Sequence, residues 1–353
     1  MKPNRPTIAD LAAFDEIIDV RSPAEFAEDH IPGAINCPVL DNEQRIEVGT
    51  LYKQVSPFEA KKIGAAYVSE NIARHLRASF LDRPKTWKPL IYCWRGGDRS
   101  GSMNTVFRAI GWQAGQLDGG YKSWRSHVIT RLQELPGQFE FKIIAGATGS
   151  AKTCILQAIG NLGEQILDLE NLASHKGSVL GVLPEQPQPS QKWFEASLMK
   201  TLLTFEPGRP IYVEAESRKI GNLHLPQTLI ERMRASECLN IEASLDARVD
   251  FLLRDYEYFL TRPDFLIKRL EGLRTLQSRE ILSRWEQLIH TGEWSTLVRE
   301  LLEMHYDPLY RGSQNRNFSG MQGSPNFTTD DLSPAGISRL ASAIVQSRTA
   351  QID

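Results

Sequence analysis

A glycine-rich stretch from Gly146 to Thr153 joins two segments of different periodicity. Residues 139–145, before it, form a short apolar run that is typical of a buried strand, and residues 152–160 have the apolar spacing of a helix. A glycine-rich turn from a strand into a helix presents backbone N–H groups and the positive end of the helix dipole, which together bind phosphate. The sequence therefore predicts an α/β unit with a diphosphate site at the end of this strand.

Most residues of this phosphate loop have an expected role. Lys152 is expected to neutralise the bound diphosphate, and Thr153 to reach a metal ion such as Mg²⁺. Ala151 replaces the glycine that normally precedes the lysine, and a left-handed backbone there would cost alanine about 1–2 kcal/mol, so weaker or altered binding is expected. The predicted phosphate-binding residues are Gly146, Thr148, Gly149, Ser150, Ala151, Lys152 and Thr153.

Two acids stand at the end of a strand predicted at residues 210–214, where a P-loop protein usually carries a metal-holding aspartate. Glu214 and Glu216 are therefore candidates for contacting a metal ion or the substrate. Each is equally compatible with a surface acid that pairs with Arg218, and both interpretations stay open at this point. We find no glutamine or arginine-finger pattern of a nucleotide hydrolase, which argues against phosphate cleavage by water.

A second anion-binding loop is predicted at residues 92–100, between a strand at 90–92 and a helix at 100–110. Paired glycines let the backbone curl so that its N–H groups point inward, and two arginines add positive charge. This field favours the thiolate form of Cys93, which can attack sulfur, selenium or phosphorus. The candidate catalytic residues are Cys93, Arg95, Gly96, Gly97 and Arg99, whereas Cys37, Cys154 and Cys238 are expected to be core or helix residues.

Strands and helices alternate in both halves of the chain, which predicts parallel sheets with helices on both faces. The expected strands lie at 17–20, 90–92 and 114–117 in the first half, and at 139–145, 165–169 and 210–214 in the second.

A linker is predicted at residues 135–137, because Pro136 and Gly137 stop the preceding helix. The predicted domains are therefore residues 1–135 and 138–353. Beyond residue 226 the pattern becomes almost wholly helical, through residues 228–304. A glycine- and serine-rich loop is expected at 312–326, followed by a last helix that begins near Ser333.

Composition limits the classes of partner and compartment. Of the 353 residues, 41 are Lys or Arg and 43 are Asp or Glu, so a polyanion must be held by a local basic patch rather than by net charge. No apolar stretch approaches the roughly 18 residues of a spanning helix, and the first ten residues contain no apolar signal core. The four cysteines lack paired spacing. A cytoplasmic protein without membrane contact, zinc site or other structural metal is expected.

Three stretches, at 19–26, 30–36 and 117–124, resemble the rhodanese (sulfurtransferase) domain in order and spacing, as does the cysteine loop. The resemblance covers residues 10–128. A rhodanese domain followed by a P-loop domain is in turn similar to the tRNA 2-selenouridine synthase family. The supporting stretches are residues 47–54, 170–178, 214–221 and 305–310.

The resemblance implies that the enzyme replaces sulfur by selenium in the 2-thiouridine at the tRNA wobble position. It implies selenophosphate as the selenium donor and an S-geranylated intermediate that is made from geranyl diphosphate, with no tightly bound cofactor. The expected partners are tRNA that carries 2-thiouridine and a supplier of selenophosphate. The phosphate loop is then expected to hold the prenyl diphosphate, and Cys93 to carry or position selenium. The candidate tRNA contacts are Arg218, Lys219, Arg262 and Arg269 in the second domain and its helical extension.

Two other functions remain compatible with parts of the sequence. The five residues between Cys93 and Arg99 also match the loop of phosphatases built on a rhodanese fold, although Tyr92 stands where many of these have histidine. A sulfurtransferase fused to a P-loop nucleotide-binding module would explain both loops but leave residues 170–178 and 305–310 without a role.

Overall fold

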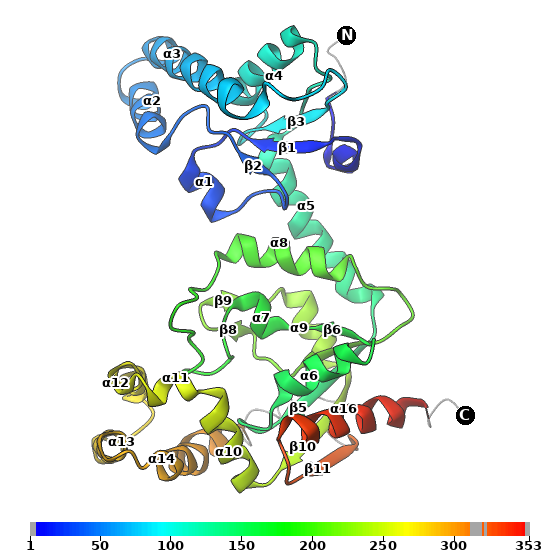
Figure 1. Ribbon diagram of the computed structural model, residues 1–353, viewed down its shortest axis with the longest axis vertical. Helices are drawn as coiled ribbons and strands as arrows, with labels where there is room; N and C mark the ends of the chain where they lie inside the picture. Colours follow the sequence, from blue (N-terminus) through cyan, green and yellow to red (C-terminus); the bar gives the residue numbers. More distant parts are fainter. Residues whose placement is uncertain (1–4, 311–319, 321–322, 350–353) are drawn as a thin grey trace. The chain divides into compact units, whose positions relative to one another are not determined.

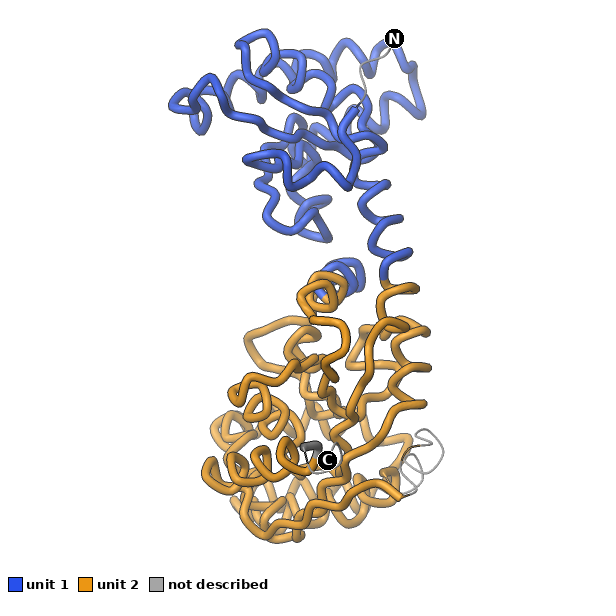
Figure 2. Tube along the Cα trace, turned by 90° about the vertical axis from the view of Figure 1, so that its right-hand side faces the viewer, with its two compact units in different colours: residues 1–131, 190–197 blue, residues 132–189, 198–353 orange. Residues whose placement is uncertain are grey.

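The computed structural model describes residues 5–310, 320 and 323–349. The chain separates into two compact units, and a short segment of the second half groups with the first. Unit 1 comprises residues 1–131 and 190–197, and unit 2 comprises residues 132–189 and 198–353 (Figure 2). No helix in the described part of the chain is long and apolar enough to cross a membrane.

Unit 1 is built on a parallel sheet with strand order β2-β1-β3-β4. The central strands are β1 (Glu16–Asp19) and β3 (Pro89–Tyr92), and the outer strands are β2 (Ile35–Asn36) and β4 (Gly115–Gln116). All four residues of β3 are buried, as expected for a strand covered on both faces. The strands predicted at 17–20, 90–92 and 114–117 are β1, β3 and β4.

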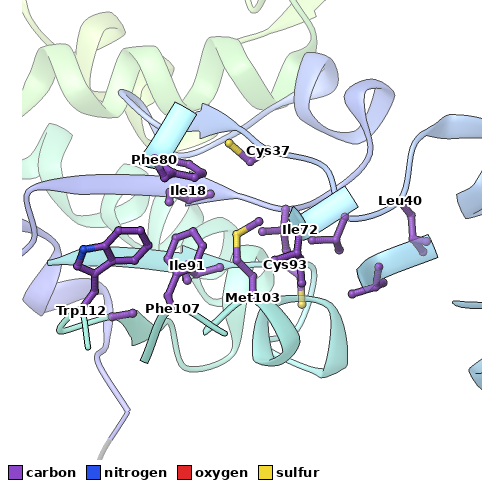
Figure 3. Packing of buried hydrophobic residues seen from close by; sticks show 14 of the residues in the cluster. Ile18, Cys37, Leu40, Ile72, Phe80, Ile91, Cys93, Met103, Phe107 and Trp112 are labelled. Carbon is purple, nitrogen blue, oxygen red and sulfur yellow. The ribbon is translucent and has the colours of Figure 1, made fainter. Parts of the chain in front are cut away.

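The helices of unit 1 follow the strands in the expected alternation. They are α1 (Pro23–Glu28), α2 (Asn42–Gln54), α3 (Pro57–His75), α4 (Asp98–Ile110) and α5 (Gly120–Glu134), with short helical turns η1 (Ile8–Ala13) and η2 (Leu76–Phe80). The core packs β1 and β3 against these helices, and Cys93 lies in it with Ile91, Met103 and Phe107 (Figure 3). The cysteine loop therefore starts from a rigid base.

Unit 2 contains a second parallel sheet, with strand order β11-β10-β5-β7-β6. Its strands are β5 (Phe141–Gly146), β6 (Gln165–Leu167), β7 (Ile211–Glu214), β10 (Glu237–Ala243) and β11 (Asn326–Thr329) (Figure 1). A separate hairpin pairs β8 (Lys219–Ile220) with β9 (Leu223–His224). Because β7 lies directly beside β5, the ends of these strands meet at the same edge of the sheet.

The helices that accompany this sheet in unit 2 are α6 (Lys152–Asn161), α7 (Leu169–Ala173), α9 (Gln227–Arg234) and α16 (Pro334–Thr349). The helix α8 (Gln191–Leu202) begins in the segment that groups with unit 1. The helix α16 packs against α6. Its start agrees with the prediction near Ser333, whose Oγ accepts a hydrogen bond from Gly336 N at 3.2 Å.

A helical extension follows β10. It consists of α10 (Leu245–Asp255), α11 (Glu257–Leu260), α12 (Pro263–Leu270), α13 (Arg279–Thr291) and α14 (Trp294–Leu301), with turns η4 (Glu271–Leu273) and η5 (Leu302–Tyr306). These helices share an apolar core centred on Trp285, which is fully buried.

The prediction of an almost wholly helical chain through residues 228–304 was wrong at the strand β10, and a second strand, β11, was missed beyond that range. The strand β10 pairs with β5 on one side and β11 on the other, inside the sheet. Its sequence alternates polar residues such as Asn240 with apolar ones such as Leu239 and Ile241, and its charged neighbours obscured this short period. The strand β11 is polar because it lies at the sheet edge. Most of the predicted loop at 312–326 lies outside the described residues.

Two smaller boundaries also differ from the prediction. The strand expected at 165–169 ends at Leu167, because the Asp168 side chain caps α7 by accepting a hydrogen bond from Asn171 N at 2.9 Å. The predicted linker at 135–137 forms the 3₁₀ turn η3 (Leu135–Gln138) instead of an open loop. Pro136 is buried there, so this connection is packed.

Candidate active sites

The cysteine loop leaves β3 and enters α4. Cys93 is only 3% exposed, and its Sγ accepts a hydrogen bond from Ser100 Oγ at 3.2 Å. Ser100 lies in the first turn of α4 and is itself fully buried. The sulfur therefore sits where the strand end, the loop and the helix N-terminus meet, as the sequence predicted from the strand–loop–helix order.

The shape of this loop is held from outside by contacts to its carbonyl groups. Gln116 Nε2 on β4 donates to Gly96 O at 2.9 Å and Gly97 O at 3.0 Å, and also to Ser100 Oγ at 2.9 Å. Arg5 Nη1 donates to Gly96 O at 2.9 Å. Neither Arg5 nor Gln116 was singled out from the sequence, because only the folded strand order brings them to residues 96–100.

The two glycines of the loop have different roles. Gly96 has φ +64°, and a Cβ there would lie 2.6 Å from Leu117 O, so no other residue fits. Gly97 has φ −95°, and a Cβ there would meet nothing within 4 Å. The reasoning from paired glycines therefore holds for Gly96, whereas Gly97 supplies the N-cap position of α4.

The two arginines of the loop also differ. Arg95 is exposed. Arg99 Nη1 lies 2.7 Å from Glu25 Oε2 on α1, so its charge is already paired. Burial acts to raise the pKa of Glu25, but the hydrogen bond and charge of Arg99 outweigh it and hold that pKa below its ordinary value. Arg99 consequently joins α1 to α4 as well as bordering the loop.

The other three cysteines are unsuited to nucleophilic work. Burial raises the pKa of Cys37 to about 12 and that of Cys238 to about 11, and it also raises the pKa of Cys154. All four cysteines are free. At neutral pH the thiols of these three residues stay protonated.

The phosphate loop of unit 2 lies between β5 and α6. Ala151 adopts φ 57° and ψ 30°, the left-handed conformation that the missing glycine would have supplied. Gly149 has φ +83°, and a Cβ there would lie 2.9 Å from Leu252 Cδ1. The loop thus keeps its turn despite the substitution, at the cost of about 1–2 kcal/mol expected for alanine.

Lys152 folds back over the loop. Its Nζ donates to Gly146 O at 2.9 Å and to Ala147 O at 3.4 Å. Burial lowers the pKa of Lys152, against the opposing influence of nearby Glu170 and Glu216. An anion in the loop would supply a new partner for this ammonium group, and would stabilise its charged form.

Acidic side chains face the lysine from β7 and α7. Thr153 Oγ1 donates to Glu170 Oε2 at 2.8 Å, and Glu170 N donates to Glu214 Oε1 at 3.1 Å. Burial raises the pKa of Glu214 well above its ordinary value, with added repulsion from Asp168 and Glu170. For Glu216, burial and then the charge of Glu170 raise the pKa to about 8. Glu216 consequently binds a proton more readily than an exposed glutamate does.

The burial of Glu214 and Glu216 bears on whether they are surface acids or belong to the site. Glu214 is fully buried, and Glu216 lines the cavity described below, so neither is a surface acid. Among the described residues, no group of three or more His, Cys, Asp or Glu is placed to hold a metal ion. Magnesium at a phosphate site typically takes one or two carboxylates together with substrate phosphates. Thr153 and Glu170 fit that arrangement, and Glu170 was not among the predicted acids.

A cavity of about 640 Å³ opens in front of the phosphate loop. Loop and acid residues line one part of it, and aromatic residues line another. Representative lining residues are Gly146, Thr148, Lys152, Thr153, Glu170, His175, Lys176, Glu216, Tyr256, Tyr306 and Tyr310. The stretches at 170–178 and 305–310, which had no role in a simple nucleotide-binding module, both contribute to this wall.

The helical extension is clamped to the phosphate loop by a buried ion pair. Arg248 on α10 donates through Nε to Thr148 O at 2.8 Å, and its Nη1 and Nη2 contact both carboxylate oxygens of Asp307, at 3.0 Å and 2.5 Å. Arg248 is 6% exposed. Sequence reasoning missed both partners, since 59 positions separate them.

The predicted tRNA contacts differ in availability. Arg218 and Lys219 are exposed at the β8 hairpin. Arg262 is exposed but lies 2.5 Å from Glu185 Oε1, and the half-buried Arg269 stacks its guanidinium 5.0 Å from the Phe265 ring centre.

Two aromatic residues near the loops, Trp94 and Tyr306, differ in their surroundings. Trp94 is 36% exposed, with its ring 5.2 Å from that of Tyr121, whereas Tyr306 lines the cavity in unit 2. Trp94 thus combines packing with an accessible face.

Comparison with known proteins covers both units. A family model described as "tRNA 2-selenouridine synthase AAA domain" matches residues 139–263, and a "Rhodanese-like domain" model matches residues 7–127. A protein of Nitrosomonas europaea named tRNA 2-selenouridine synthase is 36% identical over 278 residues, which cover 75% of this chain and 70% of that protein. One of Marinobacter nauticus with the same name is 32% identical over 355 residues, covering 89% of this chain and 93% of its own.

The chain belongs to the tRNA 2-selenouridine synthase family. The fold expected from the resemblance, a rhodanese-like parallel sheet followed by a P-loop α/β domain with helical additions, is confirmed. The family's model ends at residue 263, whereas Asp307, which clamps Arg248 against the phosphate loop, lies beyond it.

Proposed function

We propose that this member of the family is a cytoplasmic transferase that replaces sulfur by selenium in the wobble 2-thiouridine of tRNA. The names of relatives that match most of the chain support an enzyme acting on tRNA. One observation supports a prenyl diphosphate as co-substrate. The phosphate loop and Lys152 lie at the wall of a cavity of about 640 Å³, and aromatic side chains line another part of that cavity. Such a cavity suits a donor that combines a diphosphate with an apolar group.

The first step is S-geranylation. The thiocarbonyl sulfur of 2-thiouridine attacks the first carbon of geranyl diphosphate, the carbon–oxygen bond breaks, and inorganic diphosphate leaves with the proton that N3 of the base gives up. Negative charge grows on the departing diphosphate, where loop N–H groups and the Lys152 ammonium stabilise it. The uridine sulfur becomes a thioether, which is a better leaving group than the original thiocarbonyl sulfur.

The second step is selenation. The selenium of selenophosphate attacks C2 of the modified uridine, and the carbon–sulfur bond breaks so that geranylthiol leaves with a proton. Water then accepts the phosphoryl group, the selenium–phosphorus bond breaks, and phosphate is released. We assign Cys93 to carrying or positioning the selenium species, because its buried sulfur lies at the start of α4, where Ser100 Oγ donates a hydrogen bond to it. A cellular supplier of selenophosphate is required as a partner.

Magnesium is the metal that fits this proposal. Thr153 and Glu170 would hold it together with diphosphate oxygens. When bound, the ion would neutralise charge on the leaving diphosphate. The Thr153–Glu170 hydrogen bond keeps both groups oriented towards each other.

The phosphatase alternative receives no support from the cysteine loop. A phosphatase of this type binds phosphoryl oxygens through its loop arginine, and here Arg99 directs Nη1 and Nη2 towards Glu25. The hydroxyl group of Tyr92 accepts a hydrogen bond from Ile31 N at 3.1 Å. We therefore assign this side chain to stabilising the fold and not to catalysis.

A reciprocal pair of variants tests the proposal. With thiolated tRNA, geranyl diphosphate and selenophosphate, Lys152→Ala should lose geranylation by about a hundredfold or more, because charge on the departing diphosphate is no longer neutralised. Cys93→Ala should geranylate normally and accumulate geranylated tRNA. Mass spectrometry of the wobble nucleoside measures both products.

Lys200→Ala, at an exposed position, and Cys37→Ala, in the core of unit 1, are the matched controls. Unchanged geranylation by Lys152→Ala would refute the role of the phosphate loop. Normal selenation by Cys93→Ala would refute the role of the cysteine.

A further inference from the structure

A second cavity, of about 70 Å³, lies among the helices of the extension. Its walls come from the P-loop, residues 178–180, α10, α11, α12, α14 and η5. The residues that line it are Thr148, Ser178, Leu180, Leu252, Leu253, Tyr256, Phe259, Leu266, Trp294, Leu297, Val298, Leu301, Leu302 and Tyr306.

This cavity adjoins the one in front of the phosphate loop. Five residues line both: Thr148, Ser178, Leu252, Tyr256 and Tyr306. Thr148 belongs to the phosphate loop itself, and Arg248 holds its carbonyl group in place. A ligand whose head group occupies the loop therefore has the second cavity next to it.

Polar side chains are confined to the shared boundary. Thr148, Ser178, Tyr256 and Tyr306 all line both cavities, whereas every lining residue beyond them is aliphatic or aromatic. A nucleobase in this cavity would lose its hydrogen bonds to water without regaining them, at a substantial free-energy cost. A hydrocarbon chain would lose none, so the lining favours a hydrocarbon over a nucleoside.

The volume sets the length of that chain. One water molecule occupies about 10–15 Å³ of such a cavity, so 70 Å³ has room for about five or six atoms of that size. An isoprene unit, with its five carbon atoms, has this size. We propose that this cavity binds the terminal isoprene unit of a prenyl diphosphate whose diphosphate occupies the P-loop, and that Val298 on α14 helps to set the chain length. This inference rests on the proposed geranylation and names the residues that would select its donor.

Binding measurements without tRNA test the inference on the full chain. Calorimetry measures the affinity of the chain for three ligands that share the diphosphate head group. Inorganic diphosphate has no tail, dimethylallyl diphosphate has one isoprene unit, and geranyl diphosphate has a second unit that reaches the cavity. Geranyl diphosphate should bind about a hundredfold tighter than dimethylallyl diphosphate, because only its second isoprene unit enters the apolar cavity.

Val298→Phe should abolish this preference by filling the cavity, with the affinity for inorganic diphosphate unchanged. Val298 is only partly buried, so the larger side chain is compatible with folding. Val298→Ala enlarges the cavity and should keep the preference. Ile281→Phe, at a partly buried position packed on the same helical core but outside the cavity, is the matched control and should also keep it.

Each outcome separates this inference from the proposed function. Equal affinity of the wild type for the two prenyl donors, or an unchanged preference in Val298→Phe, would overturn the inference even if tRNA is geranylated. A preference that Val298→Phe abolishes supports it even if no prenyl group reaches tRNA, in which case the proposed function fails.

Discussion

Ala151 is strained by its place in the phosphate loop. Its left-handed backbone is a conformation in which alanine is disfavoured by about 1–2 kcal/mol. The same methyl group is 4% exposed and packs in the core between α6 and its neighbours, which returns about 0.8 kcal/mol. The two effects oppose each other, and the strain is the larger.

Ala151→Gly should therefore raise the free energy of unfolding slightly, by up to about 1 kcal/mol, because glycine relieves the strain but loses the buried methyl. Urea denaturation of the full chain measures the change. Ala173→Gly, at a buried alanine with an ordinary helical backbone, should instead destabilise. A loss of more than 1 kcal/mol in Ala151→Gly would mean that packing, and not strain, dominates at this position.

At the scale of elements, the clamp between α10 and the residues after η5 determines where the helical extension meets the phosphate loop. Arg248 contacts both Thr148 and Asp307, with almost no exposure to solvent. A buried guanidinium that loses its carboxylate leaves an uncompensated charge, which costs more than the ion pair itself contributes.

Asp307→Ala should lower the free energy of unfolding by about 3 kcal/mol and weaken diphosphate binding, because Arg248 then lacks its partner beside the phosphate loop. Chemical denaturation and calorimetry with inorganic diphosphate measure the two effects. Glu303→Ala, at an exposed position of η5, is the control and should change neither by much. Wild-type stability in Asp307→Ala would show that the clamp contributes little.

At the scale of the whole molecule, buried carboxyl groups make stability depend on pH. The pKa of Glu216 is about 8 in the folded chain, against an ordinary value of 4.5. Between these pH values the folded state holds a proton that the unfolded chain releases. This contribution to the free energy of unfolding is therefore present below about pH 4.5 and is lost as the pH rises through about 8.

Glu216→Gln removes this titration, so its stability relative to wild type should increase between about pH 5 and about pH 8.5. Each unit of pKa difference between the folded and unfolded chain corresponds to about 1.4 kcal/mol in the free energy of unfolding. Because Glu216 is partly exposed to the cavity, we expect the variant to gain only about 1 kcal/mol or more over wild type. Thermal and urea unfolding at both pH values measure it. Glu242→Gln, at an exposed position, should show no such dependence on pH, and a parallel response of the two variants would contradict the assignment.

Local patterns accounted for much of the fold. The strands β1, β3, β5 and β7 and the helices α4 and α6 lie close to their predicted ranges, because each combines an apolar period with a glycine- or proline-marked end. The strands β10 and β11 were missed, because their pairing depends on neighbours far away in sequence. Glu170 was missed as a partner of Thr153 for the same reason, although its stretch was noticed.

By itself, the sequence determined the two loops and the family, since a strand end, a glycine-rich turn and a helix start are set by a few adjacent residues. Tertiary structure decided which side chains complete each site. Glu25 reaches Arg99, Gln116 holds the cysteine loop, and Asp307 reaches Arg248 only after sheets and helices have packed. Tertiary packing also raises the pKa of Glu216 and forms the apolar cavity among the helices of the extension. Both depend on what surrounds a side chain in space and not on its neighbours along the chain.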